Sequence, residues 1–415
     1  MKVEQMCAAA QRAARTLATL PRARKDEALG AVGDAVTRRS AEILAENQED
    51  LRLARENRLA DALVDRLLLD EDRLRDMVAG VRAVGALPDP VGQLVDGWRL
   101  ANGVEVRRVR VPLGVVAVIY EARPNVTVDA ASLCLKTGNA VILRGGSAAK
   151  HTNRILAEVV QGAILEAGLP REAVSYLSPD RRELDELIKQ RRYVDLVIPR
   201  GGEELKDYLL EHSKVPVIYA AGGNCHVYVD AAADLAKALP IIVNAKCQRP
   251  GVCNAAETLL VHRAVAAEFL PRAVDELKRR GVELVVDKAA GDVLQDPALK
   301  RANRTHYETE FLALKLAVRV VDTLDEALEH IATFGTRHSE AIVTEDLAAA
   351  RRFTAAVDAA CVYVNASTRF TDGGEFGLGA EMGISTQKLH VRGPIALQEL
   401  TCVKYELWGD GQVRG

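Results

Sequence analysis

The first 90 residues show the apolar spacing of helices. Segment 26–56 carries apolar residues at helical intervals and contains no proline. The pattern changes in 104-VEVRRVRVPLGVVAVIYEARP-124, where alternating apolar and basic residues are followed by an unbroken apolar run. Alternation is typical of a strand with one solvent-exposed face, and a continuous run is typical of a strand buried on both faces. We therefore predict an N-terminal helical region followed by strands.

Beyond residue 124, short apolar runs alternate with helical segments such as 151–168. This rhythm is typical of βα units and a parallel sheet. Thr323 and Glu326 have the spacing of a capping box at the start of a helix over 327–332. The predicted strands are 140–143, 194–198, 216–220 and 226–230, then 256–261, 282–286, 316–321, 341–344 and 361–364, with a last strand at 400–408. We expect two α/β domains that meet near residue 225.

Length and composition agree with this division. A chain of 415 residues exceeds what one hydrophobic core usually fills. Hydrophobic residues make up 48% and charged residues 27%, as in ordinary globular enzymes. The net charge of -3 argues against nucleic-acid binding, and no apolar run approaches the roughly 20 residues that cross a bilayer. We expect a protein that binds neither nucleic acid nor membrane.

The N-terminus and the cysteines bear on the compartment. The basic, amphipathic start is interrupted by Gln11, Arg12 and Arg15, and acidic residues return in 24–32, so a first helix is expected in place of a targeting signal. Seven cysteines, an odd number in a large chain, indicate reduced thiols. No CxxC or HExxH motif occurs, which argues against a zinc site. We expect a cytoplasmic protein without a metal.

Three glycine-rich loops follow predicted strands: 144-RGGSAAK-150, 199-PRGG-202 and 221-AGGN-224. Backbone without Cβ at the carboxyl ends of parallel strands can approach a pyrophosphate closely. Arg144 and Lys150 would add charge suited to the extra phosphate of NADP. None of the loops matches GxGxxG, and each one alone could be a simple turn. Three together predict a nucleotide-binding domain.

The segment 246-KCQRPGVCNAAETLLVH-262 contains the candidate nucleophile. Cys253 follows a Pro-Gly turn, and Arg249 nearby would favour the thiolate, which attacks carbonyls. Cys247 ends the helical stretch 231–247, where packing explains it, and a Cys247–Cys253 disulfide would disable the thiolate. Four other cysteines lie in apolar or strand-like runs and fit the usual small, buried hydrophobe; these are Cys134, Cys225, Cys361 and Cys402. Cys7 lies in the predicted first helix and shows no sign of function.

Several segments together resemble the γ-glutamyl phosphate reductases of the aldehyde dehydrogenase superfamily, over nearly the whole chain. The segment 373-GGEFGLGAEMGISTQKLH-390 is particular to this branch, and the others are 115–131, 136–148, 221–230, 249–262 and 361–394. The resemblance implies an aldehyde-dehydrogenase-like α/β fold in three parts. They are a Rossmann-like NADP-binding domain (1–103 and 116–225), an α/β catalytic domain (226–385) and a small β oligomerisation extension (104–115 and 386–415).

The resemblance also implies roles for single residues. Cys253 occupies the position of the catalytic thiol, while Cys247 stands where the branch usually has threonine. Asn125 is the candidate to stabilise the oxyanion, or it is a turn residue. Arg123 and Arg249 bind the phosphate group, or they form structural ion pairs. Glu310 holds the nicotinamide ribose, or it is a solvated carboxylate. Segment 365–377 closes the substrate pocket or is an ordinary loop. The implied cofactor-binding set is Arg144, Gly145, Gly146, Ser147, Gly201, Gly202 and Glu310, with NADPH as cofactor.

The chemistry that the resemblance implies is a reduction. Hydrolytic aldehyde dehydrogenases carry a water-activating glutamate where this chain has Ala220-Ala221, and a thioester consumed by hydride needs no water. The expected reaction is the NADPH-dependent conversion of L-glutamyl 5-phosphate to L-glutamate 5-semialdehyde and phosphate in proline biosynthesis. We expect a homo-oligomer, dimer or tetramer, with glutamate 5-kinase as a partner. The alternatives are a CoA-acylating aldehyde dehydrogenase and a catalytically silent scaffold.

Overall fold

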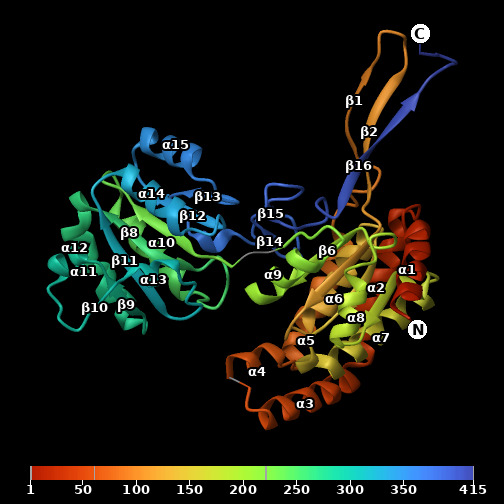
Figure 1. Cartoon of the computed structure of the whole chain (residues 1–415), viewed down its shortest axis with the longest axis horizontal. Helices are drawn as coiled ribbons and strands as arrows, with labels where there is room; N and C mark the ends of the chain where they lie inside the picture. The colour runs from red at the N-terminus through yellow and green to blue at the C-terminus, as the bar shows by residue number, and fades with distance from the viewer. Residues whose placement is uncertain (1, 60, 220–221, 415) are drawn as a thin grey trace. The chain divides into compact units, whose positions relative to one another are not determined.

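The computed structural model describes residues 2–59, 61–219 and 222–414. The chain forms two compact units, whose elements are labelled in Figure 1. The first unit comprises Met1–Tyr219, Gly377–Gly383 and Ile395–Gly415, and the second comprises Ala220–Phe376 and Ile384–Pro394. The division falls a few residues before the expected position near 225. Within the described residues, no helix is both long and apolar enough to cross a membrane.

The first unit is built around a four-stranded parallel sheet of order β5-β4-β3-β6. Every residue of β3 is buried, as its unbroken apolar run predicts. The strands are β3 (Val115–Tyr120), β4 (Ala140–Arg144), β5 (Val174–Leu177) and β6 (Leu196–Arg200). The helices are α1 (Val3–Leu17), α2 (Arg22–Arg38), α3 (Ser40–Glu56), α4 (Asp61–Leu67), α5 (Glu71–Ala86), α6 (Asn125–Lys136), α7 (Lys150–Glu166), α8 (Arg181–Leu187) and α9 (Glu203–His212), with short 3-10 turns η1 (Ser147–Ala149) and η2 (Arg171–Ala173).

Among the described residues of this unit, one predicted strand is absent and one observed strand was not predicted. The described part of 216–220 is not a strand: Val217 forms a single parallel bridge to Val197, and residue 220 lies outside the described residues. Pro216 has no N–H to donate to a sheet, which limits pairing there. The sequence does not predict the short strand β5, because Ser175 and Tyr176 interrupt its apolar pattern.

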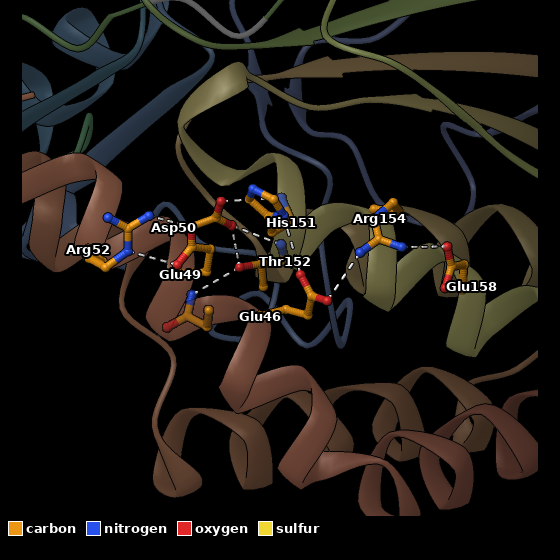
Figure 2. A network of polar contacts seen from close by, with 9 residues as sticks. Glu46, Glu49, Asp50, Arg52, His151, Thr152, Arg154 and Glu158 are labelled. Atoms are coloured by element: carbon orange, nitrogen blue, oxygen red, sulfur yellow. Dashed lines mark hydrogen bonds and ion pairs between the residues drawn. The ribbon is translucent and has the colours of Figure 1, made fainter.

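Asp50 joins α3 to the beginning of α7, as Figure 2 shows. Its buried carboxylate accepts hydrogen bonds from the backbone N–H groups of His151 (3.2 Å) and Thr152 (2.8 Å) and from the Thr152 hydroxyl (2.6 Å). Asn47, also buried, donates to the same hydroxyl at 3.2 Å. A carboxylate at a helix N-terminus satisfies N–H groups that have no partner within the helix. The N-terminus of α7 is thus occupied by the chain's own anion.

We expect Asp50→Ala to lower the free energy of unfolding by about 2–4 kcal/mol, because three hydrogen bonds to a buried charge are lost. The midpoint of thermal unfolding, followed by scanning fluorimetry, measures the change. Glu49→Ala is the matched control, since Glu49 is its neighbour in α3 but forms an exposed ion pair with Arg52. Exposed pairs contribute little, so its midpoint should stay close to that of the wild type. Equal shifts in both variants would contradict the role of Asp50.

The second unit contains a seven-stranded parallel sheet of order β10-β9-β11-β8-β7-β12-β13. Successive residues of β7 face opposite sides: Val227 and Val229 pack in one apolar cluster and Tyr228 in another. The strands are β7 (Cys225–Val229), β8 (Ala256–His262), β9 (Glu283–Val286), β10 (Lys300–Arg301), β11 (Lys315–Val321), β12 (Ser339–Val343) and β13 (Cys361–Val364). The second strand series of the sequence is confirmed within two residues at each start.

Helices cover this sheet, and one of them begins at the predicted cap. The Thr323 hydroxyl accepts from the Glu326 N–H at 3.2 Å, while the Glu326 carboxylate bonds the Asp322 N–H. The helices are α10 (Leu235–Cys247), α11 (Arg263–Arg279), α12 (Lys288–Leu294), α13 (Arg304–Glu308), α14 (Leu324–Phe334) and α15 (Leu347–Ala356), followed by η3 (Thr368–Phe370) and a small pair, β14 (Ile384–Ser385) and β15 (Gly393–Pro394).

A three-stranded antiparallel sheet extends from the first unit as a ribbon (Figure 1). It consists of β1 (Leu94–Arg99), β2 (Glu105–Pro112) and β16 (Thr401–Trp408). The strand predictions at 104–112 and 400–408 are confirmed. Strand β1, which is exposed along its whole length, has no apolar pattern to predict it.

Candidate active site

The candidate nucleophile lies on a tight turn between α10 and β8. The Ala255 N–H donates to the Val252 carbonyl at 3.1 Å, which closes the turn around Cys253 and Asn254. Cys253 is half-buried. Cys253 therefore lies on a turn after the Pro-Gly pair that follows the helix, as the sequence predicts.

Of the other cysteines, Cys247 is half-buried like Cys253, Cys402 is exposed and the rest are buried. None of the seven forms a disulfide. Burial raises the pKa of Cys7 to about 12, raises that of Cys134 further, and also raises that of Cys247, so these thiols stay protonated. The expectation that Cys402 is buried is wrong: it lies on the edge strand β16 and is exposed.

Gly223 packs directly against the cysteine turn. An ideal Cβ at Gly223 would overlap the carbonyl group of Cys253, so only glycine fits. The same carbonyl oxygen accepts a hydrogen bond from the Cys225 thiol at 3.2 Å. The Gly223 N–H donates to a Glu310 carboxylate oxygen at 2.6 Å. The structure therefore brings Cys253, Gly223 and Glu310 together, although the sequence separates them widely.

This placement corrects one prediction. The loop 221–224 is expected to follow a strand of the first domain and to approach a phosphate. Its described residues, 222–224, lie in the second unit and precede β7. Ala220 and Ala221, expected from the resemblance to stand in place of the water-activating glutamate, lie outside the described residues.

A strap of residues 367–372 fixes Asn254, the residue after the nucleophile. The buried Asn254 side chain donates to the carbonyls of Thr371 (2.9 Å) and Arg369 (3.3 Å). Its backbone carbonyl accepts from the Thr368 hydroxyl at 2.7 Å, and its amide oxygen accepts from the Arg369 guanidinium. The sequence analysis gives segment 365–377 as a loop that closes the substrate pocket or as an ordinary loop, and it assigns no role to Arg369 or Asn254.

A buried ion pair lies at the base of the same loop. Lys246, near the end of α10, contacts Glu257 of β8 at 2.6 Å, and both side chains are fully buried. Burial raises the pKa of Glu257 to about 7 and lowers that of Lys246, while their mutual attraction opposes both shifts. The pair joins the two ends of the Cys253 loop, and no local sequence pattern indicates it.

In the first unit, the predicted cofactor loops lie at the carboxyl edge of the sheet. Strand β3 pairs with β4 on one side and β6 on the other, so the strand order reverses beside it, where open α/β sheets bind ligands. A Cβ at Gly145 would overlap the Asn153 side chain, and one at Gly201 would lie 2.7 Å from the Glu121 carboxyl carbon. Other side chains of the first unit therefore fill the space that a side chain at Gly145 or Gly201 would need.

The other residues of the predicted cofactor-binding set in this unit differ in their contacts and exposure. Arg144 donates to the Pro179 carbonyl at 2.7 Å, and burial lowers the pKa of its guanidinium. The Gly202 N–H, at the start of α9, donates to the Glu121 carboxylate at 3.1 Å. Gly146 precedes η1, and Ser147, the first residue of η1, is exposed.

Arg123 and Asn125 follow β3 at the same edge. Asn125 is the first residue of α6 and donates its side-chain amide to the Asp129 carboxylate at 2.8 Å. Burial raises the pKa of Asp129 to about 6, and the Asn125 bond partly opposes that rise. Arg123 donates its backbone N–H to the Glu121 carbonyl. These residues belong to the first unit, whereas Cys253, Arg249 and Glu310 belong to the second.

Two sheets of this topology, with a half-buried cysteine on a glycine-packed turn, define the class of protein. Residues 1–308 match the sequence model of the aldehyde dehydrogenase family, and the chain belongs to that family. An acetylating aldehyde dehydrogenase from Geobacillus thermoglucosidasius has the same fold, with a TM-score of 0.72 at 18% identity over 100% of this chain and 97% of that one.

Within the family, the chain belongs with the γ-glutamyl phosphate reductases. It is 54% identical to the γ-glutamyl phosphate reductase of Moorella thermoacetica over 98% of this chain and 97% of that one. It is 52% identical to that of Syntrophomonas wolfei over 98% and 96%. The solved γ-glutamyl phosphate reductase of Thermotoga maritima superposes with a TM-score of 0.97 at 43% identity, and each chain is fully covered. The resemblance and the fold predicted from the sequence are confirmed.

Proposed function

We propose that the protein reduces L-glutamyl 5-phosphate to L-glutamate 5-semialdehyde and phosphate in proline biosynthesis. The observation that carries the proposal is the Cys253 turn, presented half-buried and held by Gly223 and Asn254, in a chain about half identical to γ-glutamyl phosphate reductases. A silent scaffold would not need a reactive thiol constrained on both sides.

The chemistry begins at the Cys253 sulfur. The thiolate attacks the γ-carbonyl carbon, an S–C bond forms, and the C–O bond to phosphate breaks with its electron pair leaving on phosphate. Backbone N–H groups beside Cys253 stabilise the tetrahedral oxyanion, and each such donor is typically worth about 3 kcal/mol. Asn125 is the proposed side-chain donor, which requires its amide to turn from Asp129.

NADPH, when bound, supplies the hydride that converts the thioester to the aldehyde. The proposed holding residues are Arg144, Gly145, Gly146, Ser147, Gly201, Gly202 and Glu310. Arg144 adds positive charge suited to the extra phosphate of NADP, and backbone without Cβ at the glycines can approach a pyrophosphate closely. Arg123 and Arg249 are proposed to bind the phosphate that leaves, since guanidinium matches phosphate geometry.

The test is the reverse reaction with purified protein. Semialdehyde, NADP and inorganic phosphate should together produce reduced cofactor, and omission of phosphate should abolish the signal. Replacing phosphate by CoA should give none. Activity with CoA and without phosphate would transfer the protein to the CoA-acylating class, which the 18% identical acetylating enzyme represents only at the level of the fold.

The proposal extends to the domains and to assembly. We assign NADP binding to 1–103 and 116–225, catalysis to 226–385, and oligomer contacts to 104–115 and 386–415. The ribbon of β1, β2 and β16 exposes Trp98, Tyr405 and Trp408, and such exposed apolar residues favour a homo-oligomer, dimer or tetramer. Light scattering of the purified protein tests this, and a monomer at micromolar concentration would contradict it.

Localisation and a partner follow from the same chemistry. Free thiols at all seven cysteines suit the reducing cytoplasm, where we place the protein. Glutamate 5-kinase is the proposed partner, because an acyl phosphate hydrolyses readily and benefits from direct handover. Co-purification of the two proteins tests the contact.

A further inference from the structure

Two arginines beside the Cys253 turn have no carboxylate partner. Within the described part of the chain, neither Arg249 nor Arg369 forms an ion pair, and the Arg249 side chain is exposed. Some other arginines of the second unit do form ion pairs, as Arg263 does with Asp322 and Arg319 with Glu326. Guanidinium groups left without a counter-charge beside a nucleophile are suited to receive an anion.

The Arg369 guanidinium is held across the loop that carries both Arg249 and Cys253. Its Nε donates to the Gln248 amide oxygen at 2.8 Å, and its Nη1 donates to the Asn254 amide oxygen. Gln248 precedes Arg249, and Asn254 follows Cys253. Both acceptors are neutral amides, so these bonds orient the guanidinium without neutralising its charge.

The remaining donors of Arg369 are available to a ligand. A guanidinium has five N–H groups, and the three beyond these two bonds have no partner among the described residues. A planar fork of this kind matches phosphate oxygens in a bidentate manner. The neighbouring Asp372 carboxylate accepts from the Gly374 and Glu375 N–H groups of its own turn, so it is already engaged.

The charges around Arg369 support an anion site. Burial lowers the pKa of Arg369 most, and the positive charge of Arg249 lowers it further, while Asp372, Cys253 and Glu375 oppose these effects. Arg369 is therefore close enough to Arg249 for the two charges to repel, and close enough to Cys253 to be stabilised by its thiolate. A phosphate dianion between the two guanidinium groups would relieve their repulsion.

We propose that Arg369 and Arg249 form a two-arginine clamp for the phosphate group of the acyl phosphate. The inference rests on the proposed function and adds Arg369 to it as a substrate-binding residue. As the sulfur–carbon bond forms at Cys253, the C–O bond breaks and the clamp takes up the charge that develops on the departing phosphate. In the reverse direction the same clamp binds inorganic phosphate.

The experiment measures the KM for inorganic phosphate in the reverse reaction. Arg369→Met and Arg249→Met should each raise it about 10- to 100-fold, the range for loss of a charge-assisted contact. The KM for semialdehyde and the Kd for NADP, measured by fluorescence, should stay within about twofold. Arg369→Lys should recover part of the loss, and Arg263→Met, which removes an exposed ion pair elsewhere in the unit, should change nothing.

A second measurement distinguishes phosphate binding by the two arginines from a role of Arg369 in positioning Asn254 alone. Phosphate should slow iodoacetamide alkylation of Cys253 in the wild type, and this protection should be lost in Arg369→Met and Arg249→Met. If these variants lower kcat and leave the KM for phosphate and the protection intact, Arg369 only positions Asn254 and the clamp is wrong. If Arg369→Met does not fold, the KM for phosphate of Arg249→Met tests the clamp instead, because the Arg249 side chain is exposed. A wild-type reaction independent of phosphate would instead contradict the proposed function itself.

Discussion

Cys253→Ala is expected to lower kcat/KM for the reverse reaction by a factor on the order of 10⁴ or more, because covalent catalysis has no substitute once its nucleophile is gone. The variant should still fold, since the half-buried side chain loses only its sulfur. NADP binding, measured by fluorescence titration, should be unchanged. Phosphate-dependent formation of reduced cofactor, followed spectrophotometrically, gives the rate.

Two other thiols provide matched controls for this substitution. Cys247 lies only six positions away and is also half-buried, yet burial raises its pKa and it ends helix α10. Cys402 is exposed on β16. Cys247→Ala and Cys402→Ala should each retain activity within a few-fold of the wild type. Substantial activity in Cys253→Ala, or its loss in Cys247→Ala alone, would remove Cys253 from the mechanism.

Gly223→Ala is expected to have the second largest effect, although Gly223 carries no side chain to react. The added methyl group would overlap the Cys253 carbonyl, and this contact is with backbone that cannot rotate away. Either the cysteine turn or the segment before β7 must move. We expect a loss of about 1–3 kcal/mol in stability and a decrease in kcat of at least about 100-fold, since small displacements of reacting groups are costly.

Gly251→Ala is the control for that prediction, because it lies in the same loop as Cys253. A Cβ at Gly251 would be 3.8 Å from the Leu312 carbonyl oxygen, an ordinary van der Waals contact. Its kcat and its thermal midpoint should therefore match those of the wild type. Steady-state kinetics and scanning fluorimetry measure both variants side by side, and a normal kcat in Gly223→Ala would show that the contact does not position Cys253.

Local patterns predicted the elements well where the pattern is strong. The buried run of β3 and the strand at β2 are confirmed, as is the helix start at Thr323. Failures occur where local signals are weak or contradictory. Pro216 removes a donor from an otherwise apolar run, and β1 has no apolar periodicity because both of its faces are exposed.

The candidate site likewise contains residues that the sequence could identify and residues that it could not. The Pro-Gly turn and its thiol are local features, so Cys253 could be chosen from the sequence, and its catalytic role stays a prediction. Arg369 could not be chosen, because its bond to Asn254 joins residues 115 positions apart. Glu310 and Gly223 are 87 positions apart, and only the packing of the second unit places them together.

The sequence by itself determined the class of fold, through the short-range spacing of apolar residues, and the family, through a resemblance that covers nearly the whole chain. It also selected Cys253 as the candidate nucleophile, because that thiol follows a Pro-Gly turn. Tertiary structure alone decided what surrounds that residue: the glycine packed against the Cys253 carbonyl, the arginine oriented by two amides, and the Asp50 carboxylate bound to α7 across 102 positions. Such contacts arise when sheets and helices pack, and packing brings together side chains whose separation along the chain carries no periodic signal.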